Sequence, residues 1–167
     1  MNKVKIRYQR LSDAKRFFDI ITQGNFDYTS ANPKTIEEEK KFLRKNKEKR
    51  DKKSEYNYSV IYNGKLVGAV GVSVHSHHPG SGEIGYFVDK NYWNLGITTR
   101  AVKLLEKICK TKFKLRRLEI CMDPRNKASE QVAKKCGYKK EGHMKQVIKN
   151  KRGQWVDLLL YAKIISK

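Results

Sequence analysis

The sequence has few cysteines and prolines and no long apolar run. Three cysteines and three prolines occur among its 167 residues. Cys109, Cys121 and Cys136 show no paired spacing, so we expect buried, reduced thiols in a cytoplasmic protein instead of a disulfide framework. No apolar segment approaches the ~20 residues of a membrane-spanning helix, and residues 1–5 lack a signal-peptide pattern. These shortages predict no membrane association and one domain over residues 1–167, long enough to bury a core.

Acidic residues are also scarce, because 17 Asp and Glu stand against 38 Lys and Arg, which gives a formal net charge of +21. A field of this sign attracts polyanions and predicts nonspecific, salt-dependent association with nucleic acid or ribosomes. The basic residues are spread along the chain and not confined to one tail. That distribution favours the alternative interpretation, in which lysine simply fills solvated faces.

Period-two alternation of apolar and polar residues predicts most of the sheet. Asn63-Gly64 is the strongest short hairpin signal and is expected to join two of the strands. Antiparallel strands followed by a crossover helix predict a mixed sheet and an α/β (α+β) fold class. The expected strands are residues 4–8, 56–62, 66–74, 83–88, 117–122, 138–148 and 154–164.

Helix starts and ends are signalled by capping residues. Ser12 is expected to cap the first helix, which Gly24 ends. Thr35 and Glu38 fit a capping box at the start of a second helix. A short helix is expected over residues 126–135, and a further one is considered below with the loop that precedes it.

Two loops carry residues that invite a functional interpretation. Residues 25–33 form a loop that contains aromatic side chains, and residues 75–82 form a turn with three close histidines. Zinc sites usually draw ligands from separated positions and include cysteine or carboxylate, and neither lies beside these histidines. We therefore predict a turn there and no metal site.

The most informative stretch covers residues 82–100. A strand with alternating apolar residues is followed by a turn on Gly96 and by a helix, which Thr98 or Thr99 can cap. The first N–H groups of a helix have no internal partner and carry about half a positive charge. A strand, a glycine turn and a helix start therefore predict a site for phosphate or pyrophosphate, although an ordinary strand–loop–helix turn is the alternative.

Two separated blocks resemble the GCN5-related N-acetyltransferase (GNAT) superfamily, and the resemblance covers nearly the whole chain. It is closest to the branch with ribosomal-protein N-terminal acetyltransferases and polyamine acetyltransferases. It implies a mixed, mostly antiparallel sheet of about seven strands flanked by about four helices. The matching residues are Glu83-Ile84-Gly85-Tyr86, Tyr92-Trp93, Gly96-Ile97, Thr99, the segment 123–129, Cys136-Gly137-Tyr138, Glu141-Gly142 and the segment 153–157.

The resemblance implies an enzyme that transfers an acetyl group from acetyl-coenzyme A directly to a primary amine, with a protein N-terminal α-amine preferred. A polyamine, aminoglycoside or amino acid acceptor is the alternative. Deprotonating a lysine-type amine near pKa 10.4 at neutral pH costs about 4–5 kcal/mol, whereas an α-amine near pKa 7.7–8.0 costs about 1 kcal/mol. A third hypothesis is a non-catalytic RNA- or ribosome-binding module with a degenerate loop. A homodimer through the terminal hairpin also stays open.

The resemblance also implies which residues hold the cofactor. Asn94 stands where a loop glycine is usual, and asparagine tolerates positive φ better than most residues. Whether Asn94 weakens coenzyme A binding is left open. The backbone of Phe87 and Val88 is expected to meet the pantetheine arm. The other expected cofactor contacts are Asn94, Leu95, Gly96, Ile97, Thr98, Thr99 and Asn126.

Two residues are the candidates for the chemistry. Glu83 is expected to act as the base, with a structural carboxylate paired to a lysine as the alternative. Many family members place a tyrosine where this chain has Ala133, so Ser129 is the candidate acid for the leaving thiolate. Both Ser129 and Asn126 could instead be ordinary helix-start residues.

Overall fold

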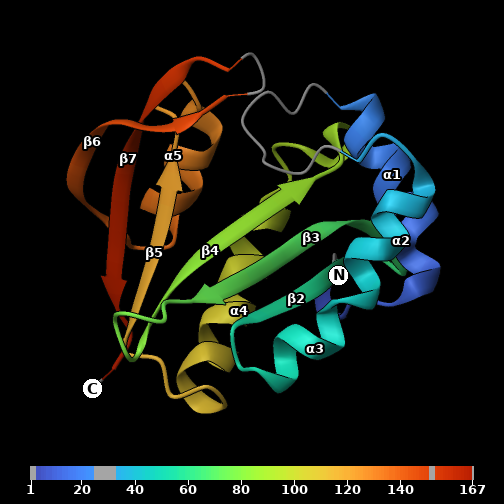
Figure 1. Cartoon of the computed structure of the whole chain (residues 1–167), viewed down its shortest axis with the longest axis horizontal. Helices are drawn as coiled ribbons and strands as arrows, with labels where there is room; N and C mark the ends of the chain where they lie inside the picture. Colours follow the sequence, from blue (N-terminus) through green and yellow to red (C-terminus); the bar gives the residue numbers. More distant parts are fainter. Residues whose placement is uncertain (1–2, 25–32, 151–152, 167) are drawn as a thin grey trace.

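The computed structural model describes residues 3–24, 33–150 and 153–166 (Figure 1). Within these residues one seven-stranded sheet has the order β1-β2-β3-β4-β5-β7-β6, and only the β4–β5 pair is parallel. The strands are β1 (Val4–Tyr8), β2 (Glu55–Tyr62), β3 (Lys65–Val74), β4 (Ser81–Val88), β5 (Arg117–Met122), β6 (Lys139–Lys149) and β7 (Trp155–Ile164). The helices are α1 (Ala14–Gln23), α2 (Ile36–Arg44), α3 (Asn46–Asp51), α4 (Ile97–Thr111) and α5 (Lys127–Lys135), with 3₁₀ turns η1 (Leu11–Asp13) and η2 (Lys90–Tyr92).

The hairpin forms as its signal predicts, and the second helix starts at the predicted cap, but only half of the predicted capping box forms because the Glu38 carboxylate accepts from the Lys34 N–H and not from the Thr35 N–H. Asn63 and Gly64 have φ values of 47° and 83°, the left-handed pair that a tight hairpin turn needs. Thr35 caps α2, and its hydroxyl accepts a hydrogen bond of 3.2 Å from the backbone N–H of Glu38. The expected cap at Ser12 is wrong, because the chain enters α1 through η1 and Ser12 lies inside that turn. The predicted loop at residues 25–33 falls almost entirely outside the described residues.

The two faces of the sheet bury different apolar clusters. Because side chains alternate along a strand, Ile84 packs in the large cluster under α4 and α5, whereas Phe87 packs against a smaller cluster under α1 and α2. Phe17 of α1 is completely buried in that smaller cluster, with its ring centroid 5.8 Å from that of Phe87. Strand β4 therefore has a large apolar cluster on one face and a smaller apolar cluster on the other.

The sheet opens beside β4. Residues 81–83 of β4 pair in parallel with residues 117–119 of β5, and the pairing stops there. Beyond Glu83 the two strands diverge, as Figure 1 shows, while β5 continues along β7. Residues 84–88 keep β3 as a neighbour on one edge. Their other edge faces the gap between the two strands.

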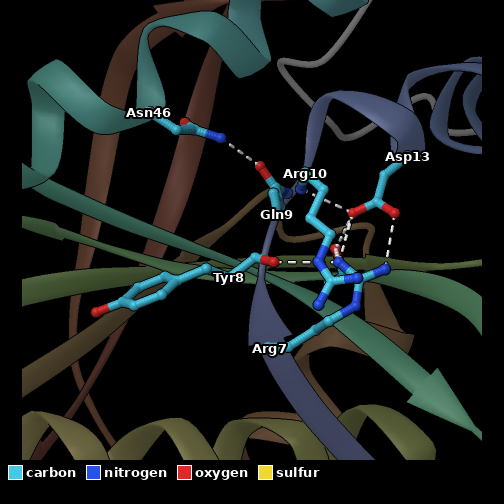
Figure 2. A network of polar contacts seen from close by, with 7 residues as sticks. Arg7, Tyr8, Gln9, Arg10, Asp13 and Asn46 are labelled. Carbon is cyan, nitrogen blue, oxygen red and sulfur yellow. Dashed lines mark hydrogen bonds and ion pairs between the residues drawn. The ribbon is translucent and has the colours of Figure 1, made fainter.

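A buried ion pair fastens β1 to the start of α1 (Figure 2). The Arg7 guanidinium donates to both carboxylate oxygens of Asp13 at 2.7 Å, Ser59 donates to the same carboxylate at 2.7 Å, and the Arg10 backbone N–H donates at 2.9 Å. Burial raises the pKa of Asp13, but these donors outweigh burial and hold the pKa below its usual value. The network joins β1, β2 and α1 on the side of the sheet where α1 and α2 lie.

Candidate active site

The backbone of β4 points alternately to β3 and to the gap. The N–H of His75 donates to the carbonyl of Ser81 at 3.0 Å, and the N–H of Asp89 donates to Val67 at 2.8 Å. Odd-numbered residues of β4 therefore bond to β3, and the backbone groups of Tyr86 and Val88 face the gap. Backbone groups at such an edge are candidate partners for an extended ligand with amide groups, in the way that an added strand pairs with a sheet.

The backbone of Phe87 is directed away from the gap. A Cβ atom placed on Gly68 of β3 would lie 2.2 Å from the Phe87 carbonyl oxygen, so this carbonyl faces β3. Of the two strand residues expected to meet an extended cofactor arm, the structure therefore brings only Val88 to the open edge. The Val88 carbonyl also accepts a hydrogen bond of 2.7 Å from the indole N–H of Trp93.

The loop before α4 uses two residues in the left-handed conformation. Asn94 has φ of 61° and Gly96 has φ of 69°, so Asn94 adopts the geometry expected of a loop glycine. Leu95 between them is 49% exposed and lies on the rim of the loop. A Cβ atom on Gly96 would meet no atom of the described residues within 4 Å, so the backbone is open to an approaching ligand.

The N-terminus of α4 offers free backbone donors. Gly96 is the N-cap, no side chain of the described residues accepts at the cap, and the first intrahelical bond runs from the Arg100 N–H to the Gly96 carbonyl at 3.1 Å. The expected threonine cap is therefore wrong, because Thr98 and Thr99 lie within the first turn. Their N–H groups and that of Ile97 precede the first intrahelical bond, which makes a site for phosphate oxygens.

Ser129 and Asn126 meet β4 at the start of α5. The Asn126 side chain caps α5 by accepting from the Ser129 N–H at 3.0 Å, as the helix-start alternative predicts. The Ser129 hydroxyl lies 2.9 Å from the Tyr86 hydroxyl, which also donates to the Ser129 carbonyl at 3.3 Å. Burial raises the pKa of Tyr86 to about 12, although the bond to Ser129 opposes the shift. The Tyr86 phenol therefore keeps its single proton at physiological pH, and when it directs that proton to the Ser129 hydroxyl and not to the Ser129 carbonyl, the serine proton is free for another acceptor.

Sequence analysis did not assign a role to Tyr86. Its even spacing with Ile84 and Val88 places it on the face covered by α4 and α5. A hydroxyl on an apolar face needs a hydrogen-bond partner, and this was the available signal. The partner lies 43 residues away in the sequence, so its identity needed the structure.

Glu83 lies on the opposite face of β4. It stands in register with Glu119 of β5, and within the described residues its carboxylate has no hydrogen bond or ion pair. Burial raises the pKa of Glu83, the positive potential of His75 lowers it, and the Glu119 carboxylate raises it. The alternative of a lysine-paired structural carboxylate finds no partner in the described part of the chain. A half-buried carboxylate with a raised pKa is a candidate general base.

A cavity of about 450 Å³ opens on this face, between α2 and strands β2, β3 and β4. Gly71 and Gly85 stand opposite each other in its floor. A Cβ atom on Gly71 would lie 2.3 Å from the Asn57 side-chain oxygen, whereas one on Gly85 would meet no described atom within 4 Å. The floor is therefore open backbone at Gly85, two residues along the same face of β4 from Glu83, which does not itself line the cavity.

Polar side chains fix the wall of the cavity near β1 and β2. Asn46 of α3 donates to Gln9 at 2.8 Å, which Figure 2 shows, and Asn57 donates to Asn46 at 3.0 Å and to Glu55 at 2.6 Å. Asn46 is 3% exposed, so this chain of amides is built into the interior. Gln9, Asn57 and Glu55 all line the cavity and are held in fixed orientations.

The predicted turn at residues 75–82 joins β3 to β4. A second hollow of about 600 Å³ lies beside this turn, lined in part by His77, His78 and Arg116. Among the described residues no group of three His, Cys, Asp or Glu side chains could hold a metal ion. In the same residues no helix combines the length and the hydropathy needed to span a membrane.

The sequence matches the family described as an acetyltransferase (GNAT) domain over residues 3–139. Among curated proteins it is similar to Probable N-acetyltransferase YjcK of Bacillus subtilis (strain 168). That relative is 32% identical over 126 residues, which covers 74% of this chain and 69% of the relative.

Two solved structures share the architecture. RimL, a ribosomal L7/L12 alpha-N-protein acetyltransferase in complex with coenzyme A, has a TM-score of 0.88 at 20% identity, covering 96% of this chain and 93% of that chain. The ribosomal-protein-S5-alanine acetyltransferase from Vibrio fischeri has a TM-score of 0.87 at 23% identity, covering 100% of this chain and 98% of that chain. At these identities the likeness establishes the fold, and the predicted architecture is confirmed.

Proposed function

The chain belongs to the GNAT acetyltransferase family and is an N-acetyltransferase, and we propose that it acetylates the N-terminal α-amine of a protein with acetyl-coenzyme A. One observation about β4 carries the proposal. Glu83 presents a half-buried carboxylate on one face of this strand, and residues 84–88 present a backbone edge that pairs with no strand among the described residues, beside the N-terminus of α4. An acyl donor and an amine can therefore reach the same strand from opposite sides.

Acetyl-coenzyme A fits the residues around the gap. The N–H groups of Ile97, Thr98 and Thr99 would bind its pyrophosphate, and the open backbone at Gly96 leaves room for that approach. The gap-facing backbone of Val88 would bind the amides of its pantetheine arm. When bound, this cosubstrate supplies the thioester-activated acetyl group. The net charge of +21 adds long-range attraction for its phosphates.

Glu83 would accept the proton that the acceptor ammonium must lose before attack. An α-amine near pKa 7.7–8.0 needs about 1 kcal/mol at neutral pH. A carboxylate whose pKa is raised by burial is sufficient for that task, either directly or through one water. The neutral nitrogen then attacks the acetyl carbonyl, the C–N bond forms, and the C–S bond breaks.

Ser129 would donate a hydrogen bond to the departing sulfur. Its hydroxyl is oriented by the bond to Tyr86 at 2.9 Å, and its backbone is fixed by the Asn126 cap. The second proton of the attacking nitrogen leaves as the amide forms, and the sulfur gains one proton to become a thiol. The Tyr86–Ser129 pair provides a path for that proton to the sulfur side of β4.

The α-amine acceptor is supported by two considerations. Its low deprotonation cost suits a single carboxylate base, and two structural neighbours of this fold are described as acting on ribosomal-protein N-termini or alanine residues. A small-molecule amine is the second candidate, because the cavity beside Glu83 carries several carboxylates.

A panel of acceptors tests the proposal. Nucleic-acid-free protein is incubated with acetyl-coenzyme A and with peptides, spermidine or an aminoglycoside, and thiol release is followed. Peptide acetylation at the α-amine, verified by mass spectrometry, supports the proposal. Turnover of a small amine without any peptide acetylation overturns the acceptor assignment. Calorimetric titration without micromolar binding of acetyl-coenzyme A overturns the cofactor assignment and favours a non-catalytic binding module.

A further inference from the structure

One carboxylate in the cavity has no partner. Glu39 of α2 is 7% exposed and lines the cavity, and within the described residues its side chain makes no hydrogen bond or ion pair. The chain contains 38 lysines and arginines, so partners are abundant. Burial alone raises the pKa of Glu39. A nearly buried carboxylate without a partner is destabilising, so its side chain is available for a ligand.

The other two carboxylates that line the cavity are engaged, whereas Glu83, which does not line it, also has no partner among the described residues. Glu38 accepts a hydrogen bond of 2.7 Å from the Lys34 backbone N–H, and Glu55 pairs with Lys49 at 2.8 Å. Exposed Glu37, on the same helix, has two basic partners, Arg44 at 2.8 Å and Lys40 at 3.3 Å. Among the described residues, Glu39 is therefore the cavity-lining carboxylate without a partner. Glu37, which is exposed on the same helix, is neutralised by its basic partners.

We propose that Glu39 binds a second positive charge on the acceptor, so that the preferred acceptor is an amine that carries a further ammonium or guanidinium group. This rests on the proposed function, because the cavity then holds the acceptor. The cavity reaches Ser73 and Gly85, which lie opposite and next to Glu83. One amine can therefore lie at Glu83 while the second charge lies at Glu39.

The charge of the whole protein makes this contact useful. A net charge of +21 repels a polycation from the surface. An unpaired carboxylate in a cavity opposes that repulsion locally, and a hydrogen-bonded ion pair formed out of water is stronger than one at the surface. The second charge can come from a lysine or arginine near the N-terminus of a peptide or from a polyamine. Both share the same recognition chemistry.

The test compares matched acceptors on wild type, Glu39→Gln and Glu37→Gln. One pair consists of two peptides that differ by lysine or glutamine at the second position, and the other pair is spermidine against butylamine. The readout is the ratio of kcat/KM for the cationic acceptor to that for its neutral partner, at saturating acetyl-coenzyme A. We expect wild type to prefer the cationic member by about 10–100-fold. In Glu39→Gln this ratio should fall at least tenfold, and in Glu37→Gln it should equal that of wild type.

The two sources of the charge are separated by which pair shows the preference. A ratio in Glu39→Gln within twofold of wild type for both pairs overturns the proposal. Thermal melting verifies that Glu39→Gln folds, and removal of an unpaired buried charge should leave its Tm at or above that of wild type. If no amine is turned over, the proposed function fails. The contact is then tested by calorimetric titration of spermidine, where equal binding to wild type and Glu39→Gln overturns it.

Discussion

The two sides of β4 offer candidate ligand contacts of different kinds. On the side of the gap, the candidate contacts are backbone groups of Val88 and of the α4 N-terminus, with one hydroxyl pair. On the side of the cavity, they are carboxylates above a floor of glycine. Backbone recognition depends on conformation and tolerates a change of side chain, whereas side-chain recognition depends on identity. Asn94, which replaces a loop glycine, lies on the gap side, where a change of side chain should be tolerated. Glu83 and Glu39 lie on the cavity side, where the identity of the side chain matters.

The largest effect is expected from Glu83→Gln, which removes the base and keeps the shape. We expect kcat to fall by about 10²–10³-fold, within the usual range for general base catalysis, with little change in the Kd for acetyl-coenzyme A. Because burial raises the pKa of Glu83, wild-type activity should decline as the pH falls through that pKa, and the variant should lose this acidic limb. A pH profile of kcat/KM measures both. A loss below about threefold would contradict the assignment of the base.

Asp13→Asn weakens the ion pair with Arg7 on the side of the sheet where the cavity lies. Removing one partner of a buried ion pair costs about 3 kcal/mol, and less here because Arg7 is 31% exposed. Urea unfolding at neutral pH should show a loss of about 2–3 kcal/mol, and KM for the acceptor should rise more than KM for acetyl-coenzyme A. The folded-state pKa of Asp13 is lowered, so its stabilisation is present above the unfolded pKa and is lost as pH falls through the folded pKa.

A matched control for that variant is Asp19→Asn on α1. Asp19 pairs at 3.0 Å with Lys15, which is 74% exposed, so this substitution should cost at most about 0.5 kcal/mol. Equal losses in the two variants would mean that the buried network is no stronger than a surface pair.

Ser129→Ala and Tyr86→Phe test the hydroxyl pair on the gap side. We expect kcat to fall by about 10–100-fold for Ser129→Ala and by about tenfold or less for Tyr86→Phe, since the second variant leaves the serine in place. Both KM values should stay near those of wild type, which separates a role at the leaving sulfur from a role in binding. Steady-state kinetics at several acceptor concentrations give the split. Unchanged kcat in both variants would assign the pair to packing.

The smallest effect is expected from Asn94→Gly. Asn94 already has φ of 61°, so glycine relieves at most about 1 kcal/mol of backbone strain and should tighten acetyl-coenzyme A binding by less than about fivefold. Calorimetric titration measures the change, and Asn63→Gly, with φ of 47° in a distant hairpin, is the control. A gain in affinity of a hundredfold or more would show that the asparagine side chain obstructs the site. It would contradict the view that binding through backbone groups tolerates this change of side chain.

Local signals in the sequence were sufficient for much of the sheet. The bounds of β1 and β5 agree with the alternation of their residues, and Asn63-Gly64 forms the turn that its conformational preference requires. Capping was less predictable at Ser12 and Thr98. A hydroxyl shows that a residue is able to cap, but the helix starts where the preceding backbone allows, which is after η1 in one case and after the left-handed Gly96 in the other.

The candidate site was only partly accessible from the sequence. The resemblance placed Glu83 and Ser129, but the Tyr86–Ser129 contact joins distant segments that periodicity cannot relate. Glu37, Glu38 and Glu39 look equivalent in sequence. The phase of α2, fixed by its Thr35 cap and its buried Leu43, turns Glu39 inward and leaves Glu37 in solvent.

The divergence of β4 from β5 also bears on solubility. An unpaired strand edge invites pairing with a strand of another molecule, which is a common route to aggregation. Here the edge lies inside the sheet, where β5 is the next strand. The space between β4 and β5 ends at Glu83, where the two strands pair. A strand of another molecule would therefore have to fit between β4 and β5 with its side chains on both faces. The interior position of this edge, with β5 beyond it, therefore protects the protein from edge-to-edge pairing with its neighbours.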